Sequence, residues 1–247
     1  MSSFAVVIPA AGQSSRFGGL EKKPFVSLDG RPIWLRSAEL FWSRSDVSGV
    51  YLVLSPEDRD SFRSRFGHLL AFTNAQIVDG GAERFESVAN ALAKVPAEVE
   101  FVAVHDAVRP LLTSKQIDAV FQTARHSGAA MLAVPLADTL KRVGADNTIT
   151  ETVPRAGLWQ AQTPQVFRRD WLSAAYANRA KLGTAITDDA QLLEAAGHRV
   201  TVVPGSPANF KITTKDDLEL AEAVIRSRFH PAEDRTPSRG LGEEAEW

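Results

Sequence analysis

The chain has 247 residues, a length that accommodates one large α/β domain with a well-buried core and makes a second full domain unexpected. Its formal charge of −2 gives no electrostatic basis for binding nucleic acid, and its lack of cysteine excludes disulfides, zinc-thiolate sites and cysteine nucleophiles. No apolar run approaches the length of a membrane span and no targeting segment opens the sequence, so we expect a cytoplasmic protein.

Short apolar runs separated by helical patterns predict the strands of a sheet. They cover residues 4–9, 50–54, 101–105, 129–135 and 199–203. Near-continuous apolar strands are covered on both faces, and alternation of strands with helices is typical of a mostly parallel sheet. We therefore predict a doubly wound, Rossmann-like α/β fold, in which ligands bind at the carboxyl ends of the strands.

Capping signals mark several helices between these runs. Ser55, followed by proline and an acid, predicts a helix start, and an apolar stripe that begins at Ile117 predicts a helix that ends at Gly128. A last helix is expected over residues 214–229, with Thr214 as its N-cap and an acid three residues later.

Residues 138–167 break the alternation with β-favouring residues and two turn sequences, Gly-Ala-Asp-Asn and Pro-Arg-Ala-Gly. This pattern predicts an antiparallel β-arm inserted into a single domain that spans residues 1–230. A hairpin is marginally stable alone, so we expect the arm to pack against a second copy in a homodimer; a hairpin folded over its own domain is the alternative. Residues 231–247 are charged and aperiodic, which predicts a disordered tail.

The stretch VVIPAAGQSSRFGG begins as a buried strand and continues in small residues. Its spacing fits neither a Walker loop, which needs a Gly-Lys-Ser/Thr triplet, nor a dinucleotide fingerprint, which needs glycine at the position of Ser14. What remains is a tight turn at Ala11 and Gly12, followed by the cation Arg16. Bare backbone N–H groups and a cation suit an anionic ligand, while an ordinary strand-to-loop turn is the alternative.

Charged residues follow this turn and another predicted strand. Lys22 and Lys23 lie just after the turn, so that one lysine can join Arg16 at the ligand, although both can also be surface charge. In HDAVRP, Asp106 offers the carboxylate oxygen that Mg²⁺ prefers, and Arg109 offers a guanidinium for phosphate. The alternative for this pair is an ion pair that closes a turn. The preceding histidine is expected to be structural.

Three further stretches complete the predicted site. In VDGGAERFES, a turn that contains Gly81 lets the backbone approach a flat ring, and Ser87 adds a hydroxyl; a plain glycine connection is the alternative. Lys211 lies at a late strand edge, where it is a site cation or surface charge, and Thr187 is expected to cap a helix. The carboxyl ends of parallel strands share one edge, so a polyphosphate site with Mg²⁺ is predicted there. The residues that predict it are Gly12, Arg16, Lys23, Gly81, Asp106, Arg109 and Lys211.

Eight stretches also resemble a known family, in matching order over residues 4–229: PAAGQSSRF, KKPF, VDGGAERFES, HDAVRP, DTLKR, TPQVF, ITDDA and NFKIT. Together they resemble the 2-C-methyl-D-erythritol 4-phosphate cytidylyltransferases of the non-mevalonate isoprenoid pathway. The resemblance implies that the phosphate oxygen of the substrate attacks the α-phosphorus of CTP, that pyrophosphate leaves, and that the enzyme is a homodimer.

The resemblance also implies roles for individual residues. Arg16 and Lys23 match the pair that stabilises the pentavalent transition state, Lys211 adds a cation at the phosphates, and Asp106 is the acid nearest the metal. The residues implied to line the nucleotide are Ala11, Gly12, Gly81, Ser87 and Asp106. Those implied to face methylerythritol phosphate are Arg109, Thr139, Thr163, Thr187 and Lys211, with Arg155 on the arm reaching the neighbouring subunit's site.

Two other functions are weighed against this interpretation. Ribitol 5-phosphate cytidylyltransferases share the same loop, and their base and metal contacts would be unchanged. A catalytically idle nucleotide-binding module is the other alternative, because fold alone does not prove turnover. The presence of Arg16 and Lys23 beside Asp106 argues against an idle module, because a binding protein has no need to stabilise charge added at the α-phosphorus.

Overall fold

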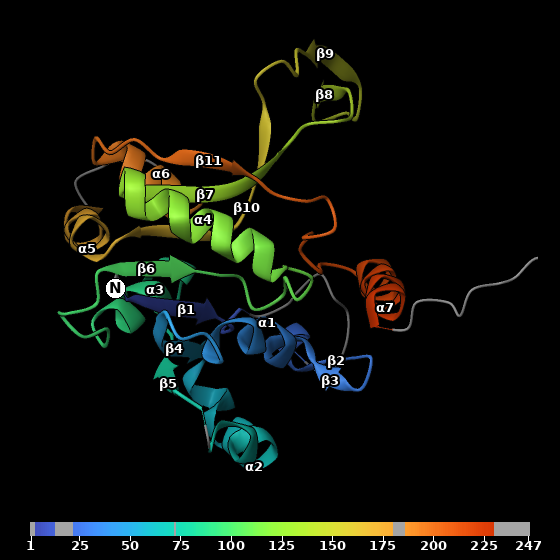
Figure 1. Cartoon of the computed structure of the whole chain (residues 1–247). Helices are drawn as coiled ribbons and strands as arrows, with labels where there is room; N and C mark the ends of the chain where they lie inside the picture. Colours follow the sequence, from blue (N-terminus) through green and yellow to red (C-terminus); the bar gives the residue numbers. More distant parts are fainter. Residues whose placement is uncertain (1–2, 13–21, 72, 180–185, 230–247) are drawn as a thin grey trace, which may run out of the picture.

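The computed structural model describes residues 3–12, 22–71, 73–179 and 186–229 (Figure 1). Arg16 and the tail over 231–247 therefore lie outside the described residues. Within the described parts, one mixed sheet has the strand order β11-β7-β10-β6-β1-β4-β5. Its strands are β1 (Phe4–Pro9), β4 (Val47–Leu54), β5 (Ala75–Asp79), β6 (Phe101–Val104), β7 (Ala129–Pro135), β10 (Trp159–Arg168) and β11 (Thr201–Pro204).

Neighbouring strands of this sheet run parallel, except that β10 is antiparallel to both β6 and β7. Helices cover both faces of the sheet (Figure 1). They are α1 (Ile33–Trp42), α2 (Arg59–Leu70), α3 (Arg84–Leu92), α4 (Ser114–Ser127), α5 (Arg169–Asn178) and α6 (Asp189–Ala195). The last helix, α7 (Lys215–Phe229), packs in a separate cluster with Leu28 and Ile33. The predicted doubly wound, mostly parallel α/β fold is confirmed.

The alternation of side chains along β1 divides the core into two layers. Val6 and Ile8 face one layer, where they pack in a cluster with residues of α1, α2 and α4. Ala5 and Val7 face the other layer, which contains residues of α3, α5 and α6. All four side chains are completely buried, as expected for a strand with helices on both sides. The sheet thereby fixes the positions of the turns at its carboxyl edge.

The predicted helix ends at Gly128 and Thr214 are confirmed. Gly128 ends α4 with a left-handed φ of 81°, a conformation that costs glycine little. Thr214 Oγ1 accepts a hydrogen bond from the Asp217 amide at 3.2 Å. The start predicted at Ser55 is confirmed as well, because the short 3₁₀ helix Pro56–Asp58 leads directly into α2.

The predicted N-cap at Thr187 is wrong by one residue. Helix α6 is capped by Asp188, whose Oδ1 accepts a hydrogen bond from the Gln191 amide at 2.8 Å. Thr187 instead donates, through its amide and its hydroxyl, to the Gln191 side-chain oxygen. Both residue types favour this position, so the local sequence does not distinguish them.

The segment expected as an arm, 138–167, divides into two parts. Its first part is a separate antiparallel hairpin of β8 (Leu140–Val143) and β9 (Ile149–Val153), which extends beyond the ends of β7 and β10 in Figure 1. Its second part is β10, which enters the main sheet and is buried over residues 162–167. The inserted region therefore supplies a central strand as well as a hairpin.

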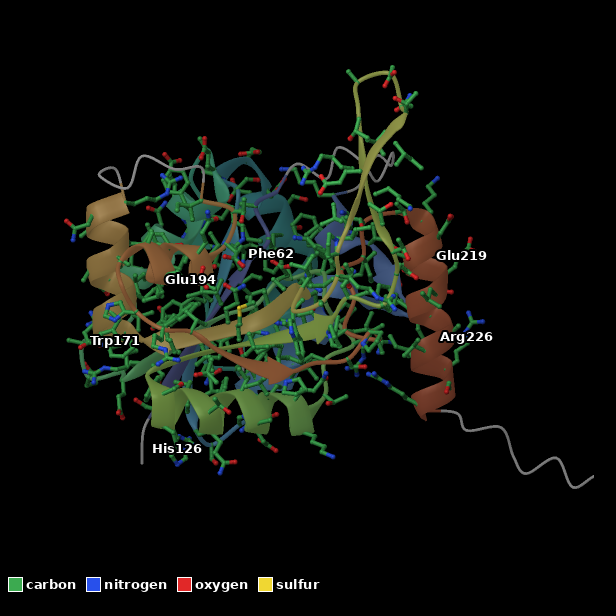
Figure 2. All side chains as sticks on the ribbon, turned by 90° about the horizontal axis from the view of Figure 1, so that it is seen from above. Phe62, His126, Trp171, Glu194, Glu219 and Arg226 are labelled. Carbon is green, nitrogen blue, oxygen red and sulfur yellow. The ribbon has the colours of Figure 1, made fainter. Side chains whose placement is uncertain are left out.

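Helices α4 and α7 lie on the surface of the molecule when it is viewed from above. Figure 2 shows α4 on one side of the sheet and α7 on another, with His126 and Arg226 on their outward surfaces. Among the described residues, no helix combines the length and apolar character needed to cross a membrane.

Candidate active site

A pocket of about 310 Å³ lies where β1, β5 and β6 end. Several residues singled out from the sequence line it: Ala11, Gly12, Lys23, Gly81, Ser87, Asp106 and Lys211. They come from the turns after these three strands, from a short 3₁₀ helix (Lys23–Phe25) and from the segment that precedes α7. The prediction that strand ends far apart in the sequence meet at one edge is confirmed for the turns after β1, β5 and β6. The predicted strand-edge position of Lys211 is wrong, because Lys211 lies in a segment between β11 and α7 that is not a strand.

Asp106 is the acidic centre of this pocket and is 8% exposed. Its Oδ2 lies 3.1 Å from Arg109 Nε and 3.2 Å from Lys211 Nζ. Burial alone would raise the pKa of Asp106, but the positive charges of Lys211, Arg109 and Arg84 hold it well below its ordinary value. The carboxylate is therefore ionised at neutral pH.

Thr163 and His105 position Asp106 from inside the protein. The Asp106 amide donates to Thr163 Oγ1 at 3.0 Å, and the same hydroxyl lies 3.1 Å from His105 Nδ1. His105 Nε2 lies 3.1 Å from the carbonyl oxygen of Arg109. Because a carbonyl only accepts, Nε2 carries the proton and Nδ1 accepts from Thr163. Burial lowers the pKa of His105 to about 4, so this ring is neutral and structural, as the sequence suggests.

The segment before α7 is fixed against the turn after β6. Arg109 Nη1 donates to the carbonyl of Asn209 at 2.9 Å, and the Ile212 amide donates to the carbonyl of Val108 at 3.0 Å. Asn209 is fully buried, and its Nδ2 donates to the carbonyl of Thr163 at 3.0 Å. These bonds hold Lys211 opposite Asp106.

The two neighbouring lysines diverge. Lys22 Nζ lies 2.7 Å from Asp58 Oδ2 and 2.9 Å from Ser55 Oγ, which directs it toward the start of α2. Lys23 is 7% exposed and lines the pocket. The lysine expected to join the site is therefore Lys23.

The double glycine before α3 allows two loops to approach closely. A Cβ on Gly80 would lie 2.8 Å from Ala11 Cβ and 2.9 Å from Ser87 Oγ. The Gly81 amide donates to Ser87 Oγ at 3.1 Å, so the serine hydroxyl supports the turn. Both residues line the pocket at this point.

This contact predicts the result of replacing Gly80 by alanine. The added methyl group overpacks the two loops, so we expect a loss of about 1–3 kcal/mol in the free energy of unfolding. Gly67→Ala is the matched control: nothing lies within 4 Å of its added Cβ, and Gly67 is inside α2. That change should stabilise the protein by about 0.5–1 kcal/mol. Chemical denaturation measures the free energy of unfolding of both variants. Equal values for the two would contradict the close approach of the two loops at Gly80.

Within the described parts of the chain, the remaining predicted residues do not line this pocket. Thr187 lines a smaller neighbouring pocket of about 90 Å³, which shares Glu83 and Arg84 with the first. Thr139 lies directly before β8, and Arg155 lies two residues after β9. Both residues are exposed and line neither pocket. Within one copy of the described chain they are thus separate from Asp106, and their contacts with a substrate stay predictions.

The comparisons with known proteins agree with this geometry. A family model, IspD: 2-C-methyl-D-erythritol 4-phosphate cytidylyltransferase, matches residues 4–227. The chain belongs to this family. It is 40% identical to the 2-C-methyl-D-erythritol 4-phosphate cytidylyltransferase of Rhodopirellula baltica, over 92% of this chain and 98% of that protein. The enzyme of the same name from Salinibacter ruber is 45% identical, over 89% and 92%.

Solved structures support the same assignment. The 2-C-methyl-D-erythritol 4-phosphate cytidylyltransferase of Thermus thermophilus aligns with a TM-score of 0.75 at 33% identity, over 92% of this chain and 100% of that chain. The IspD family carries out CTP-dependent cytidylyl transfer to methylerythritol phosphate in isoprenoid biosynthesis. The family therefore favours methylerythritol phosphate over ribitol phosphate, and an enzyme over an idle module.

Enzymes of this family depend in general on a divalent cation, and Asp106 fits such an ion. The described residues contain no group of three or more metal-ligating side chains. Mg²⁺, however, is commonly held by one or two carboxylates together with substrate phosphates. The contacts of Asp106 with Arg109 and Lys211 both use Oδ2. A single carboxylate in a pocket that Lys23 and Lys211 also line is consistent with this type of site.

Arg84 is a pocket residue to which the sequence assigned no role. It is the first residue of α3, directly after the glycine turn, and it lines both pockets. Its Nη2 lies 2.8 Å from Oδ2 of Asp189, which is distant in the sequence. The motif VDGGAERFES contains Arg84, but only the fold reveals its partner.

Proposed function

We propose that this IspD family member transfers a cytidylyl group from CTP to 2-C-methyl-D-erythritol 4-phosphate through the pocket around Asp106. The products are 4-diphosphocytidyl-2-C-methyl-D-erythritol and pyrophosphate. The observation that carries this proposal is the convergence of Asp106, Lys23 and Lys211 on a pocket walled by glycine turns. Cations and backbone N–H groups together neutralise a triphosphate.

The turns at Gly12 and Gly81 supply the nucleotide side of the site. Their bare backbone lets a flat pyrimidine ring approach, and backbone N–H and C=O groups read its edge. Ser87 supports this surface through its hydrogen bond with the Gly81 amide. Ala11 and Ser87 complete the predicted nucleotide contacts.

The reaction itself is a substitution at phosphorus. A phosphate oxygen of the acceptor forms a bond to the α-phosphorus of CTP, and the bond from that phosphorus to the bridging oxygen of the β-phosphate breaks. The electron pair leaves with pyrophosphate. Lys23 and Lys211 stabilise the charge that accumulates on the pentavalent phosphorus, and Arg16 has the same predicted role. Mg²⁺ held by Asp106 would supply further positive charge at the phosphate oxygens.

The acceptor side includes Arg109, Thr139, Thr163 and Thr187 in our proposal, with Arg155 contributed by the second copy of a homodimer. Exposed apolar side chains on and beside the hairpin favour association: Ile149 is 63% exposed, Val143 49% and Trp159 45%. The Thr163 hydroxyl is occupied by Asp106 and His105, so Thr163 contributes mainly by positioning Asp106. The cytoplasmic location expected from the sequence stays a prediction.

Pyrophosphate release tests the proposed function directly. The protein is incubated with Mg²⁺, with each of the four nucleoside triphosphates in turn, and with either methylerythritol phosphate or ribitol phosphate. We expect rapid release only with CTP and methylerythritol phosphate. Preference for ribitol phosphate, or tight CTP binding without release, would contradict the proposal.

The acceptor role of Arg155 predicts a selective effect of Arg155→Ala. Loss of a charge-assisted hydrogen bond to phosphate should raise the KM for methylerythritol phosphate about 10- to 100-fold and leave the KM for CTP unchanged. Arg142→Ala is the matched control, because Arg142 is exposed on the same hairpin and pairs with Glu151. Steady-state kinetics with each substrate varied in turn gives the two KM values for both variants. A larger change in the KM for CTP than in the KM for methylerythritol phosphate would contradict the role of the arm.

A further inference from the structure

A buried polar cluster lies beside the active-site pocket, formed by residues from three helices. Asp189, at the start of α6, is 1% exposed. Its Oδ2 lies 2.8 Å from Arg84 Nη2, and its Oδ1 accepts a hydrogen bond from the hydroxyl of Tyr176 in α5. One carboxylate thus joins α3, α5 and α6 at the edge of the pocket.

Arg84 connects this cluster with the site. Its side chain is 35% exposed, and it lines the same pocket as Asp106 and Lys211. Burial would lower the pKa of Arg84, but the charges of Asp189 and Asp106 raise it above its ordinary value. Arg84 therefore remains a cation between a buried carboxylate and the pocket carboxylate.

Stability alone is a weak explanation for such a cluster. Burying a carboxylate with an arginine costs desolvation energy that often exceeds the attraction between them, and apolar residues of similar size commonly stabilise a fold better. An arginine at the opening of a pocket has many rotamers, and a fixed partner restricts them. The arrangement is therefore suited to holding a guanidinium in one place.

The position of Asp189 along the chain adds a second connection. Thr187, the predicted acceptor contact, lies two residues earlier, and Asp188 Oδ2 accepts from Gln165 Nε2 on β10 at 2.9 Å. Residues 186–189 consequently link the acceptor side of the site to Arg84 on the nucleotide side.

We propose that Asp189 is a positioning residue, which together with Tyr176 fixes the Arg84 guanidinium where it meets the phosphate groups of CTP. This inference rests on the proposed function, because it takes the pocket to be the CTP site. Arg84 is the group in contact with the nucleotide, and Asp189 acts only through it. Removal of the Asp189 charge should therefore matter only while Arg84 is present.

A double-mutant cycle tests this dependence. Asp189→Asn keeps the shape of the side chain and removes its charge, and Arg84→Gln removes the guanidinium. We expect each single change to lower kcat/KM for CTP about 10- to 100-fold, the usual range for a charge-assisted contact. The double variant should be no worse than Arg84→Gln alone. Multiplication of the two effects would overturn the proposal.

Calorimetric titration with CTP and Mg²⁺ repeats the cycle without turnover. If the wild-type chain releases no pyrophosphate from CTP and methylerythritol phosphate, the proposed function fails, and the binding cycle still decides the role of Asp189. If Asp189→Asn does not fold, Tyr176→Phe replaces it in the cycle, with an expected loss of about 2- to 10-fold that disappears beside Arg84→Gln. Persistence of that loss would overturn the proposal.

Asp46→Asn is the matched control for loss of a buried ion pair. Asp46 is 18% exposed, pairs with Arg44 at 2.9 Å and lies before the amino end of β4, at the opposite edge of the sheet. We expect Asp46→Asn to lower the Tm and to leave kcat/KM for CTP unchanged. An equal kinetic loss in this variant would show that destabilisation, and not the position of Arg84, explains the effect of Asp189→Asn.

Discussion

Replacement of Lys23 by alanine is expected to lower kcat by about 10²- to 10³-fold, the usual cost of removing one group that stabilises transition-state charge. Lys23 is almost fully buried at the pocket, where the low dielectric would strengthen its proposed interaction with the α-phosphate. The triphosphate already carries negative charge in the ground state, but additional charge develops on the equatorial oxygens only during the reaction. The affinity for CTP should therefore change much less than turnover.

Lys22→Ala is the control that the chain itself provides. Lys22 is adjacent in the sequence and pairs with Asp58 and Glu57 outside the pocket, so its loss should affect stability slightly and turnover little. Rapid-quench measurement of pyrophosphate release and calorimetric binding of CTP separate the two quantities. Equal losses of CTP binding and turnover in Lys23→Ala would contradict its transition-state role.

Asp106→Asn should have a still larger effect, with a loss of about 10³-fold in kcat/KM. The amide retains the size of the side chain but no longer carries the charge that opposes Arg109 and Lys211 or the anionic oxygens that favour Mg²⁺. Two uncompensated cations would then compete with the metal for the phosphates. The activity that remains should fail to rise when the Mg²⁺ concentration is increased.

A suitable comparison for this variant is Asp79→Asn. Asp79 ends the parallel strand β5 and pairs with Arg59 at 2.7 Å, but its side chain is 50% exposed and does not line the pocket. Its kcat/KM should stay within about twofold of wild type, since exposed ion pairs contribute little. Magnesium titrations of pyrophosphate release test both variants. If excess Mg²⁺ alone restored the activity of Asp106→Asn, the loss of the carboxylate charge could not be the cause of its lower kcat/KM.

The convergence of Asp106 and Gly81 could be predicted because it follows from local patterns and one topological rule, whereas Lys211 reaches the pocket from a segment between β11 and α7 that is not a strand. Apolar runs identify the strands, and the carboxyl ends of parallel strands must share an edge. The resemblance to the family then predicts the chemical role of each of these residues. The role of Arg16 is predicted on the same grounds, but Arg16 lies outside the described residues.

Other features depend on long-range packing and could not be predicted in the same way. β-favouring residues identify β10 as a strand, but they do not indicate whether it pairs in the arm or between β6 and β7. The contact of Arg84 with Asp189 joins two helices that no spacing rule connects. Spacing does not choose between Lys22 and Lys23; the family resemblance indicates Lys23, and the contacts of Lys22 with Asp58 and Ser55 agree with that choice.

The docking of the segment before α7 determines when an active centre can first exist. Asn209 follows Arg109 by 100 residues, yet its carbonyl is the acceptor that secures the guanidinium, and Lys211 follows immediately. A nascent polypeptide therefore exposes Asp106 outside the ribosome well before the lysine that balances its charge has been synthesised. The pocket around Asp106 is complete only after residue 211 has been synthesised, which is later in the chain than all seven strands of the main sheet.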